Sequence, residues 1–115
     1  IIIDDSYHDH PFFEYNIRNF FPYLSKGGIY FLEDFRDSDD KLKRIRNYNK
    51  KFKKKLMGYE ITMEEKFKYF KQKKLFNDGI FNNQDLKMIY KNLEKVNLHY
   101  SGHPVSSLAA LIKKK

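Results

Sequence analysis

The hydrophobic positions of the first 34 residues form two short runs separated by a stretch with helical spacing. Residues 1–5 open with three isoleucines, and residues 29–34 open with four apolar side chains. Continuous apolar runs of this length are typical of parallel strands that are covered on both faces. Between them, over residues 12–24, apolar side chains recur every three or four positions, which predicts an amphipathic helix. The pattern therefore predicts a βαβ unit over residues 1–34.

The remaining pattern predicts two further regions of the same domain. Residues 41–76 read as two amphipathic helices, broken near Gly58 and packed over or beside the sheet. Residues 83–113 read as a helix that Asn83 caps, followed by strands at 96–100 and 107–112. Because the connection between these strands is short, they must run antiparallel. The expected fold class is α/β, with parallel strands and a final antiparallel strand pair.

Length and composition narrow the class of protein. The chain has 115 residues and no cysteine, so it forms one small domain without disulfides or thiolate metal sites. No apolar run approaches the roughly 20 residues that a membrane span needs, and no signal peptide is visible. We therefore expect a cytoplasmic protein with no membrane partner. The first residues already resemble the interior of a buried strand, which predicts the C-terminal part of a longer protein.

The net charge of +8 comes with a lysine-rich segment at residues 41–76. Lysine runs interleaved with aromatic residues at helical spacing are typical of a solvated helix face over a core stripe, and lysine abundance also follows from an AT-rich coding sequence. The alternative interpretation is a basic module that binds nucleic acid or an acidic partner. The sequence leaves the oligomeric state open, a homo-oligomer included.

Acidic residues follow both apolar runs of the βαβ unit. Asp4 and Asp5 end the first run, Glu33 and Asp34 end the second, and His8 comes three residues after Asp5. The carboxyl ends of parallel strands meet at one edge of a sheet, where ligands of open α/β sheets bind. Converging carboxylates would attract a divalent cation such as Mg²⁺ or Mn²⁺, with a histidine as general base. The alternative is that these acids only cap the strands and the next helix.

Two segments carry a resemblance to a known family. They are Ile-Ile-Asp-Asp-Ser-Tyr-His at residues 2–8 and Phe-Phe-Pro-Tyr-Leu-Ser-Lys-Gly-Gly-Ile-Tyr-Phe-Leu-Glu-Asp at residues 20–34. Together they resemble the second half of a class I S-adenosylmethionine-dependent methyltransferase, a Rossmann-like fold. More narrowly, they are similar to the metal-dependent sugar O-methyltransferases that act on macrolide antibiotics. The resemblance covers residues 1–34 and is absent from residues 41–76.

The resemblance implies a function and a set of site residues. By it, Asp5, Glu33 and Asp34 would hold Mg²⁺ (or Mn²⁺), and His8 would take the proton from the acceptor hydroxyl. The expected activity is metal-assisted transfer of a methyl group from S-adenosylmethionine to a sugar or another small hydroxylated acceptor. The glycine-rich turn that binds the cofactor in this family is not in the chain, so no residue is assigned to the cofactor and the 115 residues alone are expected to be inactive. His99 and His103 are expected to be structural or surface residues.

Overall fold

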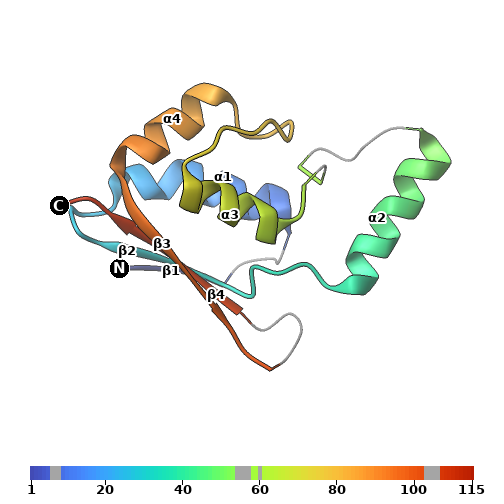
Figure 1. The fold of residues 1–115 in the computed structure, drawn as a ribbon, viewed down its shortest axis with the longest axis horizontal. Helices are drawn as coiled ribbons and strands as arrows, with labels where there is room; N and C mark the ends of the chain where they lie inside the picture. The colour runs from blue at the N-terminus through green and yellow to red at the C-terminus, as the bar shows by residue number, and fades with distance from the viewer. Residues whose placement is uncertain (6–8, 54–57, 60, 103–106) are drawn as a thin grey trace.

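The computed structural model describes residues 1–5, 9–53, 58–59, 61–102 and 107–115 (Figure 1). Its elements in chain order are β1 (Ile2–Asp4), α1 (His10–Phe20), the 3-10 helix η1 (Phe21–Tyr23), β2 (Ile29–Glu33), α2 (Asp39–Phe52), α3 (Met63–Gln72), α4 (Asn83–Asn92), β3 (Leu93–Tyr100) and β4 (Ser107–Lys113).

The four strands form one sheet in the order β1-β2-β4-β3. β1 and β2 run parallel, with Ile3 opposite Phe31, and α1 connects them. β4 lies between β2 and β3 and is antiparallel to both. The predicted mixed α/β fold is confirmed, including the parallel first pair and the antiparallel last pair.

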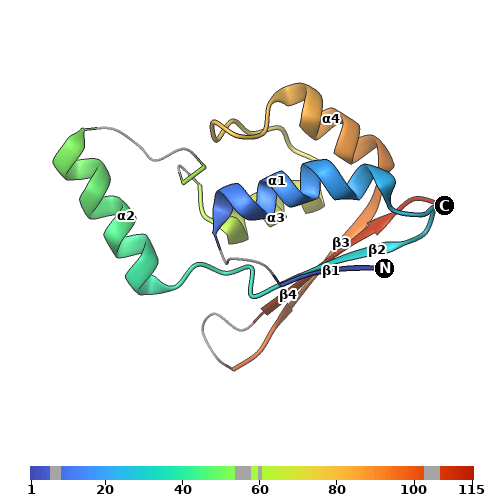
Figure 2. The same cartoon turned by 180° about the vertical axis from the view of Figure 1, so that it is seen from behind.

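Three helices cover one face of this sheet. α1, α3 and α4 lie on the same side of the strands in both views (Figures 1 and 2). The core lies between these two layers and contains buried side chains of the strands, such as Tyr30, Leu32 and Leu111, and of the helices, such as Phe13 and Leu86. None of the described helices covers the opposite face, where Ile3 of β1 is 64% exposed.

The first helix is shorter than the apolar spacing predicts. α1 begins at His10, because the Asp9 side chain accepts a hydrogen bond from the His10 backbone N–H at 3.0 Å. It ends at Phe20, and residues 21–23 continue as η1. Pro22 lies at the start of η1, where its missing N–H leaves no helical hydrogen bond unmade.

The region 41–76 contains two helices, as predicted, but only the second packs on the sheet. α3 begins after its N-cap Thr62 and buries Met63, Phe67 and Phe70 in the core. α2 has no buried residue and extends away from the layered body (Figures 1 and 2). The prediction that both helices lie over or beside the sheet is therefore wrong for α2. Its apolar stripe has the right period for packing, but a period alone does not specify what it packs against.

The last part of the chain agrees with the pattern except at the boundaries. The cap of α4 is Asn82, one residue before the predicted Asn83, and Asp85 completes a capping box with it. α4 then passes directly into β3, which begins at Leu93, three residues before the predicted start. The predicted connection at Ser101–Pro104 lies partly outside the described residues.

Candidate functional site

The carboxyl ends of β1 and β2 lie at the same edge of the sheet, because the two strands are parallel neighbours. Asp4 ends β1 opposite Leu32, and Glu33 ends β2 one residue later. Asp34 follows with a left-handed backbone (φ 52°), and its N–H donates to the Ser107 carbonyl of β4 at 2.7 Å. This bond fixes the turn at which the chain leaves the sheet.

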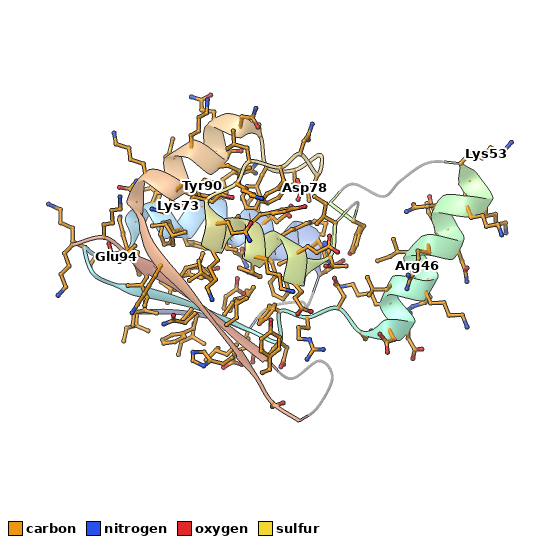
Figure 3. The ribbon with its side chains drawn as sticks, viewed as in Figure 1. Arg46, Lys53, Lys73, Asp78, Tyr90 and Glu94 are labelled. Atoms are coloured by element: carbon orange, nitrogen blue, oxygen red, sulfur yellow. The ribbon has the colours of Figure 1, made fainter. Side chains whose placement is uncertain are left out.

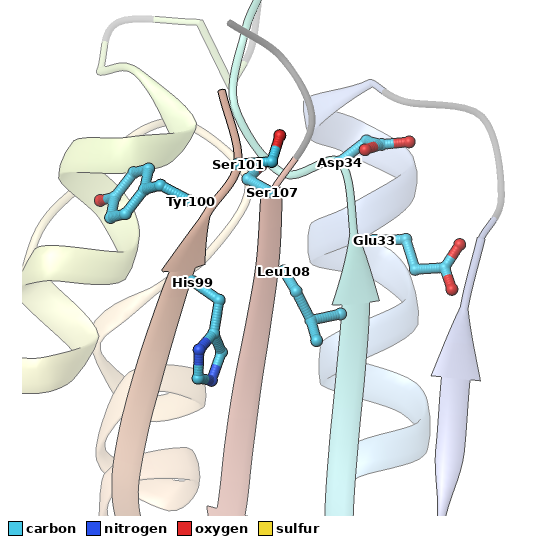
Figure 4. Close-up of a pocket in the computed structure, with 7 residues that line it drawn as sticks. All are labelled: Glu33, Asp34, His99, Tyr100, Ser101, Ser107 and Leu108. Carbon is cyan, nitrogen blue, oxygen red and sulfur yellow. The ribbon is translucent and has the colours of Figure 1, made fainter. Parts of the chain in front are cut away.

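A hollow of about 360 Å³ lies beside the end of β2. In the strand register, Glu33 of β2 faces Leu108 of β4, which faces His99 of β3. Figure 4 shows the Leu108 side chain between those of His99 and Glu33, with Asp34 and two serines at the top of the strands. The residues that line the hollow are Glu33, Asp34, His99, Tyr100, Ser101, Ser107 and Leu108.

The chemistry of this lining suits a small polyhydroxylated molecule. Two carboxylates accept hydrogen bonds from hydroxyl groups, and the serine side chains both donate and accept. The imidazole of His99 is a candidate proton acceptor, since histidine is the side chain that most often acts as a general base. His99 is exposed, which agrees with the expected structural or surface role, and its place beside this hollow depends on the register of three strands.

Asp4, next to the predicted ligand Asp5, has a structural role. Its carboxylate is buried and accepts hydrogen bonds from the Tyr30 hydroxyl at 2.5 Å and from Asn16 Nδ2 at 3.2 Å. Burial and the bond to Asp4 both raise the pKa of Tyr30, so this phenol stays a hydrogen-bond donor. Asp4 thus joins β1 to β2 and α1.

The three predicted metal ligands line two different hollows at this edge of the sheet. Asp5 is exposed and lines a second hollow, of about 440 Å³, next to Asp4 and Tyr30. Glu33 and Asp34 line the first hollow instead. Across the described residues, no group of three or more His, Cys, Asp or Glu side chains is placed to hold a metal ion. As positioned, these residues do not fit a divalent cation, so metal binding stays a prediction and we derive no step through it. The predicted base, His8, lies outside the described residues.

A buried polar cluster under the start of α1 was not predicted. His10 Nε2 lies 2.6 Å from Asp37 Oδ1, and His10 Nδ1 lies 2.6 Å from the Gly58 carbonyl oxygen. The other Asp37 oxygen accepts a hydrogen bond from the Met63 N–H at the start of α3. Burial opposes ionisation of Asp37, but the bonds from His10 and Met63 outweigh it and hold the pKa of this carboxyl below its usual range.

The second half of this cluster centres on Lys66. Its ammonium group lies 2.6 Å from Glu14, 2.9 Å from Asp78 and 3.0 Å from His10 Nδ1, and all four side chains are buried. Burial and a hydrogen bond to Asp78 raise the pKa of Glu14 to about 9, against the attraction of Lys66. The bonds from Glu14 and Lys66 overcome the burial of Asp78 and lower its pKa to about 2. At neutral pH Glu14 is therefore protonated, and Asp78 pairs with Lys66.

The cluster links several elements of the fold and does not form a ligand site. It connects α1, α3, the segment after β2 and the turn at Asp78. His10, Glu14, Lys66 and Asp78 are buried, the Asp37 side chain is 3% exposed, and these side chains contact one another. Because Glu14, Lys66 and Asp78 are far apart in the sequence, no motif or spacing predicts that their side chains meet.

Comparison with known proteins adds no assignment. No family model, no curated protein and no solved structure matches this chain. A search of the described helices found none with the length and apolar character needed to cross a membrane.

Proposed function

We propose that this chain is part of an S-adenosylmethionine-dependent O-methyltransferase that acts on a sugar or another small hydroxylated acceptor. The observation that carries the proposal is the placement of β1 and β2 as parallel neighbours with an acidic pair after each. The antiparallel β4 beside β2 also agrees with the strand pair that ends the sheet in the family that residues 1–34 resemble.

In this proposal the carboxyl edge of the sheet binds the acceptor. Glu33 and Asp34 accept hydrogen bonds from neighbouring hydroxyl groups, and Leu108 contacts the apolar face of a sugar ring. S-adenosylmethionine supplies the methyl group when it is bound, and no residue described above is assigned to it. The chain's own contribution is to orient the acceptor hydroxyl and to remove its proton. His8, from the resemblance, and His99, from the hollow, are the two candidates for the proton acceptor.

The test is methyl transfer by the product of the complete gene, measured with radiolabelled S-adenosylmethionine and a panel of sugars and small hydroxylated acceptors. Glu33→Gln and Asp34→Asn each remove a charged acceptor of a hydrogen bond. We expect each to lower kcat/KM roughly tenfold to a hundredfold. The matched control is Glu94→Gln, because Glu94 is an exposed carboxylate at the other end of the sheet (Figure 3).

Three results separate the parts of this proposal. Absence of methyl transfer to every acceptor, or full activity of both acidic variants, would reject it. His8→Ala and His99→Ala decide between the two bases, since only the true base lowers kcat steeply and shifts the pH profile. Removal of divalent metal with a chelator tests the metal prediction separately: activity lost and restored by Mg²⁺ supports that prediction, and unchanged activity rejects it.

A further inference from the structure

α2 combines a high positive charge with an apolar stripe of which no residue is fully buried. Between Asp39 and Phe52 it carries six lysines and arginines and two aspartates, both in the first turn. Those two acids stabilise the helix start, where the helix dipole favours negative charge. All other charged residues of α2 are basic, and Lys53, the residue directly after the helix, is basic as well.

Most apolar and basic side chains occupy separate sectors around the helix, and Lys41 in the first turn is the basic residue that falls among the apolar ones. At about 100° per residue, Leu42, Ile45, Tyr48 and Phe52 fall within an arc of about 120°. Basic side chains flank this arc on both sides. Lys43, Arg46 and Lys50 lie on one flank, and Arg44 and Lys51 lie on the other.

The start of α2 is bonded to the body of the molecule. Ser38 caps it, and Lys41 Nζ lies 3.3 Å from Asp9 Oδ1 and 3.8 Å from Asp37 Oδ1. Beyond that turn no residue of α2 is buried, and Phe52 at the far end is 52% exposed. Figure 3 shows Arg46 and Lys53 on a helix that stands apart from those over the sheet. Leu42, Ile45 and Tyr48 of the apolar arc are half-buried, whereas Phe52 and the basic side chains on both flanks are exposed.

We infer that α2 is a docking helix for the surface of an anionic phospholipid membrane. A helix with a narrow apolar arc and lysine or arginine on both sides lies in the plane of the membrane interface. Its apolar side chains enter the acyl boundary while its cations pair with anionic headgroups. A nucleic acid would use the cations alone and leave the stripe of Leu42, Ile45 and Phe52 without a role. The lipid surface is the partner that accounts for both features.

This inference is independent of the proposed methyltransferase activity and differs from a membrane span. With only 14 residues and a strongly polar composition, α2 lies on a bilayer rather than across it. The lack of a membrane-spanning helix among the described residues does not bear on such surface binding.

The first experiment measures sedimentation of the protein with vesicles of phosphatidylcholine alone or with added phosphatidylglycerol. We expect binding only to the anionic vesicles, weakening as salt is raised. Replacing Lys43, Arg46 and Lys50 by glutamine should lower the affinity roughly 100-fold, at about fivefold for each charge. The matched control removes three exposed lysines from other helices: Lys71→Gln, Lys87→Gln and Lys91→Gln.

The second experiment tests the apolar arc. Ile45→Asp should lower vesicle binding by at least about tenfold, because it places a charge in the acyl boundary. Met88→Asp is the control, since Met88 is an apolar residue that is 51% exposed on α4. Ile45 is not buried, so circular dichroism of the variant should match the wild type.

Three outcomes would overturn the inference. The first is equal binding to neutral and anionic vesicles, or none to either. The second is loss of binding in the control triple as large as in the α2 triple. The third is tight binding to duplex DNA or RNA that Ile45→Asp leaves unchanged while vesicles are not bound, which would assign α2 to nucleic acid.

Discussion

Glu14 makes the stability of this fold depend on pH in the neutral to alkaline range. Its folded-state pKa of about 9 lies well above its ordinary value of 4.5, because burial disfavours the charged form. The folded state therefore holds a proton that the unfolded state releases, and the free energy of unfolding falls as pH rises from about 4.5 to about 9. Glu14→Gln keeps the shape of the protonated side chain and removes the titration. We expect this variant to lose less stability than the wild type between pH 5 and pH 9, as measured by urea denaturation.

Two comparisons give this pH prediction its control. Glu94→Gln, at an exposed carboxylate, should leave the wild-type pH dependence unchanged. Asp78→Asn should act at the acid end, because the pKa of Asp78 is lowered to about 2 and its contribution disappears as pH falls below its ordinary value of 3.8. Parallel stability curves for Glu14→Gln and the wild type across pH 5–9 would contradict the assignment.

The candidate site shows which single-residue roles can be read from a sequence. The acidic edge was predictable, because parallel strands bring their carboxyl ends together. The different roles of Asp4 and Asp5 were not. Side chains alternate along a strand, so Asp4 points to Tyr30 under the helices and Asp5 to solvent. Whether Asp4 or Asp5 faces the core depends on which face of the sheet the helices cover. This is a property of the tertiary structure.

Among the helices, α4 depends most directly on its first residues. The Asn82 side chain accepts a hydrogen bond from the Asp85 N–H at 2.8 Å, and the Asp85 carboxylate accepts one from the Asn82 N–H at 3.4 Å. Leu86, Ile89 and Tyr90 of the same helix are in the core. Asn82→Ala should therefore lower the free energy of unfolding by about 1 kcal/mol. Chemical denaturation measures the loss.

Asn83→Ala provides the matched comparison for the cap. Asn83 is exposed at the first helical position, where alanine has a higher helix propensity and no bond is lost. This variant should be as stable as the wild type or slightly more stable. If both alanine variants had equal stability, the capping box would not contribute.

At the scale of elements, apolar periodicity located the helices and strands but not their neighbours. α3 and α2 have the same kind of amphipathic pattern, yet α3 packs in the core and α2 does not. The two helices differ in charge. α3 presents Met63, Phe67 and Phe70 within three turns and carries three lysines, whereas α2 carries six lysines and arginines.

The whole molecule is a two-layer structure in which one face of the sheet has no helix over it in the described chain. On that face, Ile1 is 84% and Ile3 is 64% exposed. β1 is also an end strand, hydrogen-bonded to β2 on one side. An apolar strand with a free edge favours pairing with another chain.

This uncovered face predicts how the 115-residue polypeptide behaves when it is isolated. We expect it to self-associate as concentration rises, because association removes Ile3 and the edge of β1 from water. Ile3→Lys should shift the equilibrium toward monomer, since edge lysines oppose strand pairing and the side chain at this position lies outside the core. Tyr23→Lys is the control: Tyr23 is 87% exposed in η1, so it adds the same charge away from β1. Sedimentation velocity over a concentration series distinguishes the variants. A wild-type polypeptide that stayed monomeric throughout, or a Tyr23→Lys variant that dissociated as readily as Ile3→Lys, would show that the β1 face does not drive association.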